Sequence, residues 1–323
     1  MLNELQKTAA VEATGLCRRH LYTQRDCFMI DQTQRKAYGL IFFTFFIWGS
    51  VYVAGKIAST SMPSFLVAAL RSLISMVPLW ALSRKYLPVR IEREDWKWFL
   101  LIGFLGYFFC IHSIQLGIQL TGASMASLVN ALTPVAVTIL AALILKEKIT
   151  PVKILCLILA LAGTFIITKG ASTRSETTGV IIVLLGMTGF AAASVFMRRL
   201  TAKYPPVFVT AVSMTISVFL NIPVLIWCFA TQSFHVTPEA LTALLFLGFA
   251  GSGLAQMTWT AALAILPAST CSLFYPLQPL FSAILGALLL HETFSPTFFV
   301  GLLLISLDVI LNTLETKRQV RNK

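Results

Sequence analysis

Long apolar runs separated by short polar connectors make up the chain from about residue 37 onward. An α-helix needs roughly 20 mostly apolar residues to cross a bilayer. Runs of about that length lie at 37–58, 64–83, 98–119, 122–145, 151–168, 179–198, 206–230, 240–263, 267–290 and 296–314. The pattern therefore predicts an all-α integral membrane protein with ten transmembrane helices.

One stretch of this pattern occurs twice, as TPVAVTILAALILKEKITP at 133–151 and as QPLFSAILGALLLHETFSP at 278–296. The copies align without a gap at an offset of 145 residues, which pairs Pro134 with Pro279 and Glu147 with Glu292. Such matches indicate an internal duplication. Each copy holds five spans, and a unit with an odd number of spans inserts its second copy upside down. We therefore predict two inverted-topology repeats of five helices.

The predicted organisation is a cytoplasmic N-terminal tail at 1–36, a first repeat at 37–168, an external linker at 169–178, a second repeat at 179–316 and a cytoplasmic tail at 317–323. Lys and Arg residues set this orientation, since they are enriched in cytoplasmic connectors. One side holds 21 of them, and the other holds only Lys169 and Arg174. The first 36 residues lack the apolar segment of a signal peptide. They are a solvated tail, a regulatory arm, or a start assigned too early with Met29 as the true start.

Composition agrees with a membrane protein, with 57% hydrophobic and 12% charged residues and a mean hydropathy of +0.82. The net charge of +12 comes from connectors rather than from one basic face, so we expect no nucleic-acid partner. The six cysteines form neither a disulfide framework nor a metal-binding spacing. We expect no metal and no cofactor.

Polar side chains recur at helical spacing within several spans. They are costly in hydrocarbon and normally face the interior of a bundle. The predicted substrate-binding residues are Trp48, Tyr52, Lys56, Arg71, His112, Gln115, Asn130, Thr133, Gln256, Trp259, Tyr275 and Gln278.

The paired prolines predict helix kinks, because Pro134 and Pro279 leave the carbonyls of Asn130 and Tyr275 without their usual helical donors. A substrate site at these kinks and a purely structural bend are both consistent with the pattern. The paired residues Glu147 and Glu292 close their helices, so capping or interhelix locking is the role we expect for them, rather than catalysis.

Charge inside the spans is mostly positive. Lys56 and Arg71 fall in the outer half of the first two spans, and the only acid well inside a span is Asp308. This favours a substrate that carries a carboxylate or phosphate. Snorkelling of Lys56 to the headgroups is an equal alternative. His112 is the better candidate than Asp308 to take up a proton as coupling ion, and exchange without a proton is an equal alternative.

Three stretches resemble a known family: WGSVYVAGK (Trp48 to Lys56), AALRSL (Ala68 to Leu73) and the segment from Ala126 to Gly163. They are similar to the drug/metabolite transporter superfamily, specifically to permeases built from two EamA domains with ten helices. The resemblance implies a central cavity between the domains, a small-molecule solute as partner, and the cytoplasmic (inner) membrane of a bacterium. One departure is Asp308, which stands where the first copy has Gly163.

The function that we expect is a secondary transporter that exports small anionic or zwitterionic metabolites, such as amino acids, by alternating access. The alternatives are a multidrug or nucleotide/sugar-type metabolite exchanger, and less readily a channel or a non-enzymatic membrane scaffold. A cation exporter that needs an acid in its first helix fits poorly, because that span carries Lys56. We expect no enzyme, since the chain has neither an HExxH metal pair nor a Gly-flanked nucleophilic serine. A homodimer is left open.

Overall fold

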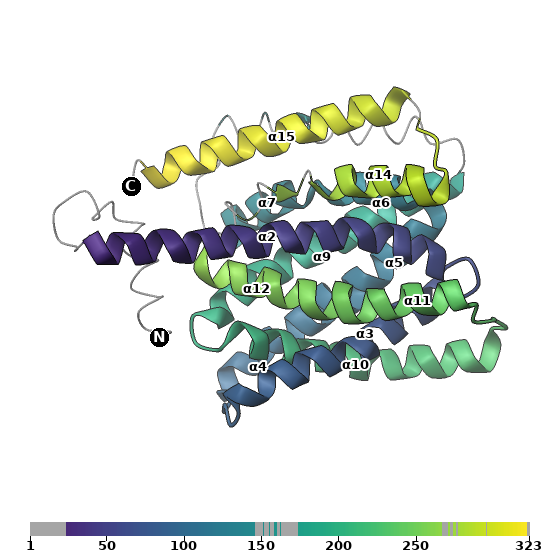
Figure 1. The fold of residues 1–323 in the computed structure, drawn as a ribbon, viewed down its shortest axis with the longest axis horizontal. Coiled ribbons are helices and arrows are strands. Elements are labelled where there is room, and N and C mark those ends of the chain that lie inside the picture. The colour runs from purple at the N-terminus through teal and green to yellow at the C-terminus, as the bar shows by residue number, and fades with distance from the viewer. Residues whose placement is uncertain are drawn as a thin grey trace.

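The computed structural model describes residues 24–145, 151, 155, 158, 159, 162, 174–266, 271, 274, 275, 277–294 and 296–321, and within them all regular structure is helical (Figure 1). The first repeat region contains α2 (Gln24–Ala58), α3 (Ser64–Ser83), η2 (Arg84–Tyr86), η3 (Arg93–Asp95), α4 (Trp96–Leu101), η4 (Ile102–Phe109), α5 (Cys110–Thr121), α6 (Ala123–Asn130) and α7 (Thr133–Leu145). The second contains α9 (Arg174–Thr201), α10 (Pro206–Thr231), α11 (Pro238–Phe246), η5 (Leu247–Leu254), α12 (Ala255–Ile265), α14 (Leu277–Leu290) and α15 (Pro296–Arg321).

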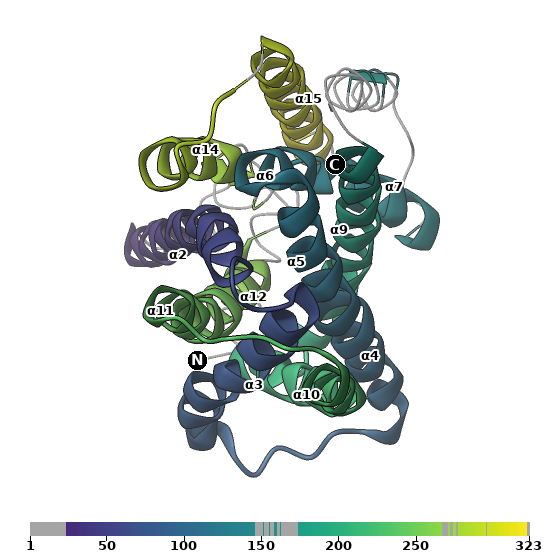
Figure 2. The ribbon, with the colours of Figure 1, turned by 90° about the vertical axis from the view of Figure 1, so that its right-hand side faces the viewer.

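The long helices lie lengthwise beside one another, as the end-on view of Figure 2 shows. The first residue of α2 and the last residue of α15 lie at the same end of the bundle (Figure 1). We call this the basic end, because the Lys- and Arg-containing connectors 84–95 and 202–205 also lie there. The connectors 59–63 and 232–237 and the residues 291–294 lie at the opposite end.

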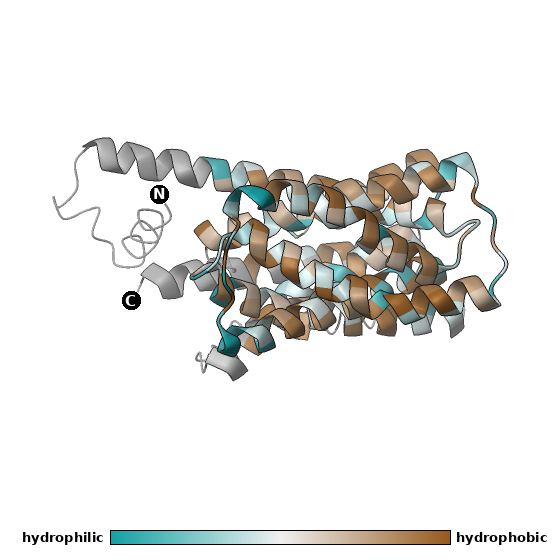
Figure 3. Cartoon of the chain, turned by 90° about the horizontal axis from the view of Figure 1, so that it is seen from below, coloured by the Kyte–Doolittle hydropathy of each residue, from teal (hydrophilic) through white to brown (hydrophobic). Residues whose placement is uncertain are grey.

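The outside of the bundle is apolar along its length (Figure 3). Large side chains such as Val77, Phe219 and Leu303 are 65% to 70% exposed. An apolar surface of this extent needs a lipid environment. Among the described residues, six helices are long and apolar enough to cross a membrane, with shorter apolar helices at Ala123–Val137 and Leu277–Leu290. The chain is an integral membrane protein.

The helices differ from the predicted spans at several boundaries. Helix α2 begins at Gln24, inside the predicted tail 1–36, and no Pro or Gly between 24 and 36 would end it. Helix α9 begins at Arg174, within the predicted linker 169–178, and α15 continues to Arg321, past the predicted end of the second repeat. Most of the predicted span 151–168 and the whole of 169–173 lie outside the described residues, as do Glu147 and the side chain of Asp308.

The predicted span 122–145 is not one helix but two, α6 and α7, separated by a turn at Ala131 and Leu132. Pro134 is the physical reason, because it has no N–H to donate to the carbonyl of Asn130. The chain supplies another donor: the Thr133 hydroxyl bonds to that carbonyl at 2.5 Å. The equivalent carbonyl, that of Tyr275 before Pro279, accepts the N–H of Gln278 at 3.0 Å.

Helix α6 begins anew after Gly122, so its first amides have no helical partners. Glu292, which follows α14, supplies the acceptors. Its carboxylate accepts the N–H of Ala123 at 2.9 Å, and the N–H and hydroxyl of Ser124 at 3.3 and 2.5 Å. A carboxylate at a helix N-terminus also interacts favourably with the helix dipole. These hydrogen bonds join the two halves of the chain.

The two halves share an irregularity that the sequence did not predict. Both Ile102–Phe109 and Leu247–Leu254 are π-helical segments, and they stand 145 residues apart at both ends. Each is followed by an amide bonded five residues back, Cys110 to Leu105 and Ala255 to Ala250. Because π-helical turns are rare in soluble and membrane proteins alike, their occurrence at one register supports the duplication.

Helices of the first half pack mainly against helices of the second half. Helix α3 packs on η5 and α10 packs on η4, while α2 packs on α12 and α14 and α9 packs on α5 and α7. Glycines make two of these contacts close. A Cβ at Gly103 would lie 2.8 Å from Ile216, and one at Gly248 would lie 2.5 Å from Ile74. Small residues at these positions allow the helices to approach closely.

We expect Glu292→Ala to destabilise the folded protein by about 1–3 kcal/mol, because three donors at the start of α6 would lose their acceptor. The measurement is thermal unfolding of the purified protein in detergent. Glu94→Ala is the matched control, since Glu94 is exposed. Equal melting temperatures for the two variants would contradict the cap.

Candidate functional site

A cluster of aromatic rings fills the seam between the two halves. Phe45 and Trp48 come from α2, Phe190 from α9, Trp259 from α12, and Tyr275 from the segment before α14. The ring centroids of Trp48 and Trp259 are 5.4 Å apart, and those of Phe45 and Tyr275 are 4.8 Å apart. Such distances allow edge-to-face contacts. The predicted residues Trp48, Trp259 and Tyr275 are therefore brought together.

Two polar atoms in this cluster lack a hydrogen-bond partner among the described residues. They are the buried indole N–H of Trp259 and the buried hydroxyl of Tyr275, which lies beside Thr133. A buried donor without an acceptor costs about 1–3 kcal/mol. Native proteins rarely retain such atoms unless water, an ion or a ligand meets them. These two atoms are therefore available to hydrogen-bond a solute that enters the seam.

Asn130 and Gln278 join the two halves directly. The Asn130 amide donates to the Gln278 side-chain oxygen at 3.1 Å, and both residues are buried. At the repeat offset of 145 residues, Asn130 is equivalent to Tyr275 and Gln278 is equivalent to Thr133. Tyr275 and Thr133 also lie side by side. The four predicted residues around the two prolines thus form two symmetry-related pairs.

Arg71 on α3 is a buried cation, with 5% of its surface exposed. Its Nε donates to the hydroxyl of Ser252 at 2.8 Å, and the charge interacts with Tyr52 and Cys110. In the part of the chain that the structure describes, no carboxylate forms an ion pair with Arg71. A buried charge is costly unless it is paired, so the site is set up for an anion.

His112 lies near Arg71 on α5. Its Nδ1 is 2.9 Å from the carbonyl of Phe108, whereas its Nε2 is buried and has no partner in the part of the chain that the structure describes. The ring also contacts Phe65, with 5.7 Å between centroids. One nitrogen is thus held by the backbone and the other is free to bind a proton or a ligand.

Other predicted residues have structural contacts. The Gln115 amide donates to the carbonyl of Gly55 at 2.9 Å and to the Ser59 hydroxyl at 3.0 Å, which ties α5 to α2. Lys56 is part-exposed and reaches the carbonyl of Gln119 at 3.4 Å, as a snorkelling lysine would. Gln256 is buried, and its side-chain oxygen has no partner.

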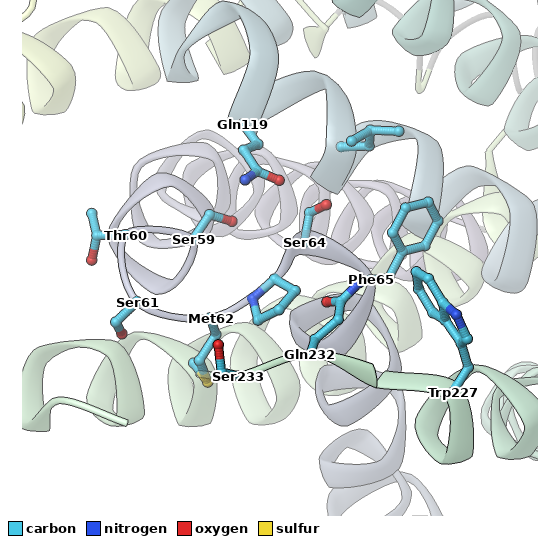
Figure 4. Close-up of a pocket in the computed structure, with 12 residues that line it drawn as sticks. Ser59, Thr60, Ser61, Met62, Ser64, Phe65, Gln119, Trp227, Gln232 and Ser233 are labelled. Atoms are coloured by element: carbon cyan, nitrogen blue, oxygen red, sulfur yellow. The ribbon is translucent and has the colours of Figure 1, made fainter. Parts of the chain in front are cut away.

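An open pocket of about 460 Å³ lies at the opposite end of the bundle from the basic end (Figure 4). Residues 59–65 form one wall, and Leu116, Gln119, Trp227, Gln232 and Ser233 form the remainder. Among the described residues that line it, none is charged. Figure 4 shows the side chains of Gln119 and Gln232 directed toward the space between the connectors.

Sequence reasoning missed this pocket and the two phenylalanines of the aromatic cluster. The pocket is made by two connectors, whose approach depends on helix packing. Phe45 and Phe190 carried one usable signal, because they stand 145 residues apart, at the repeat offset. Single aromatic residues in apolar spans are too common for that signal to have been noticed.

A lipid-facing helical bundle with two matching halves and a polar seam is the arrangement of a membrane transporter. The chain belongs to the EamA-like transporter family, whose model matches residues 35–169 and 177–314. The resemblance found in the sequence is confirmed. Small-molecule solutes and the lipid bilayer are therefore its partners.

Two relatives match most of this chain and most of their own length. The uncharacterized transporter YvbV of Bacillus subtilis (strain 168) is 26% identical over 285 residues, which cover 87% of this chain and 92% of YvbV. The uncharacterized transporter YoaV of the same organism is 27% identical over 282 residues, 84% of this chain and 95% of YoaV. A crystal structure with 20% identity has a TM-score of 0.64 and covers 86% of this chain and 98% of its own, which supports the fold alone.

We expect Asn130→Leu to destabilise the protein by about 1–3 kcal/mol, because Gln278 would keep a buried oxygen without its donor. The double variant Asn130→Leu/Gln278→Leu should be less destabilised than the two single effects added together. Thermal unfolding of all three variants in detergent measures the coupling. Additive effects would contradict a direct contact between the two halves.

Proposed function

We propose that this transporter moves small anionic or zwitterionic metabolites, such as amino acids, through the seam between its two halves by alternating access. The observation that carries the proposal is Arg71, a buried cation that donates a hydrogen bond to the neutral hydroxyl of Ser252. A carboxylate or phosphate on the solute would pair with this guanidinium. The unpartnered Trp259 N–H and Tyr275 hydroxyl would take the solute's remaining polar groups.

We also propose ten helices in two inverted repeats, with both termini in the cytoplasm of a bacterium and the bundle in its inner membrane. The repeat is supported by the matching π-helical segments and by the reciprocal packing of α3 on η5 and of α10 on η4. The bias of Lys and Arg toward the basic end supports the orientation. Export is the direction we propose, on the likeness to the family.

A multidrug or nucleotide/sugar-type exchanger is the second candidate. The aromatic cluster favours it, because stacked rings bind planar or apolar solutes without needing a charge. Arg71 decides between the two, since a guanidinium in the pathway repels cations. A nucleotide or sugar phosphate would satisfy both features, whereas a cationic drug would satisfy only the aromatic one.

We expect Arg71→Gln to abolish transport while leaving protein abundance unchanged, because the amide keeps the bond to Ser252 within reach but carries no charge. The measurement is metabolite profiling of medium and cytoplasm, comparing cells that express each form with a deletion strain. The solutes that change should carry a carboxylate or phosphate. Arg84→Gln is the control, since Arg84 is exposed at the basic end.

Normal export by Arg71→Gln at normal abundance would reject the anion-binding role. A set of exported solutes made up of cations would reject the proposed substrate class.

For coupling, we propose that His112 takes up the proton, because its Nε2 has no hydrogen-bond partner among the described residues. The positive charge of Arg71 opposes this proton unless an anion is bound beside it. In proteoliposomes loaded with the identified solute, His112→Gln should lose stimulation by a pH gradient, and Asp308→Asn should keep it. The reverse result would move coupling to Asp308. No stimulation in the unmutated protein would mean exchange without protons.

A further inference from the structure

Two connectors from different halves are joined at the basic end. Lys203, in the α9–α10 connector, places its Nζ 2.8 Å from the Glu92 carboxylate and 3.1 Å from that of Asp95, both in the α3–α4 connector. The Tyr204 hydroxyl donates to Asp95 at 2.8 Å and accepts the N–H of Glu92 at 3.1 Å. We call these four residues the latch.

The latch is a network rather than a single exposed ion pair, which would contribute little. The side chain of Asp95 is only 8% exposed and accepts from both Lys203 and Tyr204. Hydrogen bonds to Glu92 and Asp95 raise the pKa of Lys203 above its usual range, so the ammonium stays charged at physiological pH. Separating the connectors would remove both donors of Asp95 together, so the latch is either closed or open.

The same two connectors have counterparts at the opposite end. Pro205 precedes α10 as Pro63 precedes α3, at an offset of 142 residues. The same offset relates Asp95, at the start of α4, to Thr237, at the start of α11. It places Ser61 where the other half has Lys203. The counterpart of the ionic latch is therefore a pair of neutral hydroxyl residues.

The neutral counterpart is open. The pocket of about 460 Å³ lies between the connectors 59–63 and 232–237 (Figure 4). Ser61 and Gln232 both line it, and the Ser61 hydroxyl and the Gln232 side-chain oxygen are buried without a hydrogen-bond partner among the described residues. The connectors joined at the basic end therefore have counterparts with a pocket between them at the opposite end.

The pocket also leads toward the candidate site. Phe65 lines the pocket, and its ring centroid is 6.1 Å from that of Trp227 at the rim and 5.7 Å from that of His112 within the bundle. His112 in turn lies within the electrostatic reach of Arg71. The pocket is therefore connected to the candidate site through Phe65 and His112.

We propose that the latch is the gate that closes the basic end of the solute pathway, and that the pocket is the mouth of that pathway at the opposite end, so that one opens as the other closes. The inference rests on the proposed transport function and names the residues that open and close each end of the pathway. Solute would be released or captured at Gln119 and Gln232 while Lys203 holds the far connectors together. Breaking the latch shifts the population toward closure of the pocket.

Thiol labelling tests this without a known solute. In a background with the native cysteines replaced by alanine, Gln119→Cys reports the pocket, because Gln119 is exposed and lines it. A membrane-impermeant maleimide is added to intact cells. Lys203→Met should lower the labelling rate several-fold, and Tyr204→Phe should lower it less. Lys97→Met is the control, since Lys97 lies over the Trp98 ring at the same end of the bundle.

A second arm holds the latch shut. Glu92→Cys and Lys203→Cys are joined by a short reducible thiol cross-linker before labelling. The pocket cysteine should then react at least as fast as in the uncross-linked protein, and export should stop until the linker is reduced. Unchanged or faster labelling in Lys203→Met would overturn the proposal, and so would normal export by the cross-linked protein.

The outcome is separable from that of the transport proposal. A labelling shift in Lys203→Met together with normal export by Arg71→Gln would keep the gate and reject the anion-binding role. The absence of a labelling shift together with loss of export by Arg71→Gln would reject the gate and keep the substrate class.

Discussion

In hydrocarbon, every backbone polar group must find its partner inside the protein, and this constraint explains the most irregular part of the bundle. Pro134 leaves the carbonyl of Asn130 without its helical donor, and the Thr133 hydroxyl satisfies that carbonyl. The first amides of α6, at the start of the same span, also lack helical partners, and Glu292 accepts from them across the boundary between the halves. A helix start in one repeat is thus capped by a carboxylate from the other, so the two halves depend on each other.

The duplication has preserved the backbone while the chemistry of the halves has diverged. The π-helical segments and the helix-starting prolines remain in register. The packing of Gly103 and Gly248 relates Arg71 to Ser213, a buried hydroxyl that has no hydrogen-bond partner among the described residues. In the seam, the cation is therefore present in the first half and replaced by a neutral residue in the second. Such differences make the two conformations of a pseudo-symmetric bundle unequal in energy.

Several buried polar groups in the seam lack hydrogen-bond partners among the described residues. Most buried hydroxyls bond to a carbonyl three or four residues back, as Ser72 and Thr210 do. The Trp259 N–H, the Tyr275 hydroxyl and the His112 Nε2 do not. Because unpaired polar atoms cost free energy, their gathering between the halves marks the part of the structure whose interactions a solute completes.

The sequence by itself determined the helical membrane class, the duplication, the family and the residue types in the seam. Those properties follow from hydropathy, helical period and repeated prolines, which are local quantities. The sequence also indicated that Glu292 locks helices, but not that its carboxylate accepts hydrogen bonds from Ala123 and Ser124. Only the tertiary structure decided which residues meet: Phe45 with Tyr275, Arg71 with Ser252, and Lys203 with Asp95. Each of these pairs is more than 100 residues apart in the chain, so its contact depends on how helices of different halves pack, which no local pattern records.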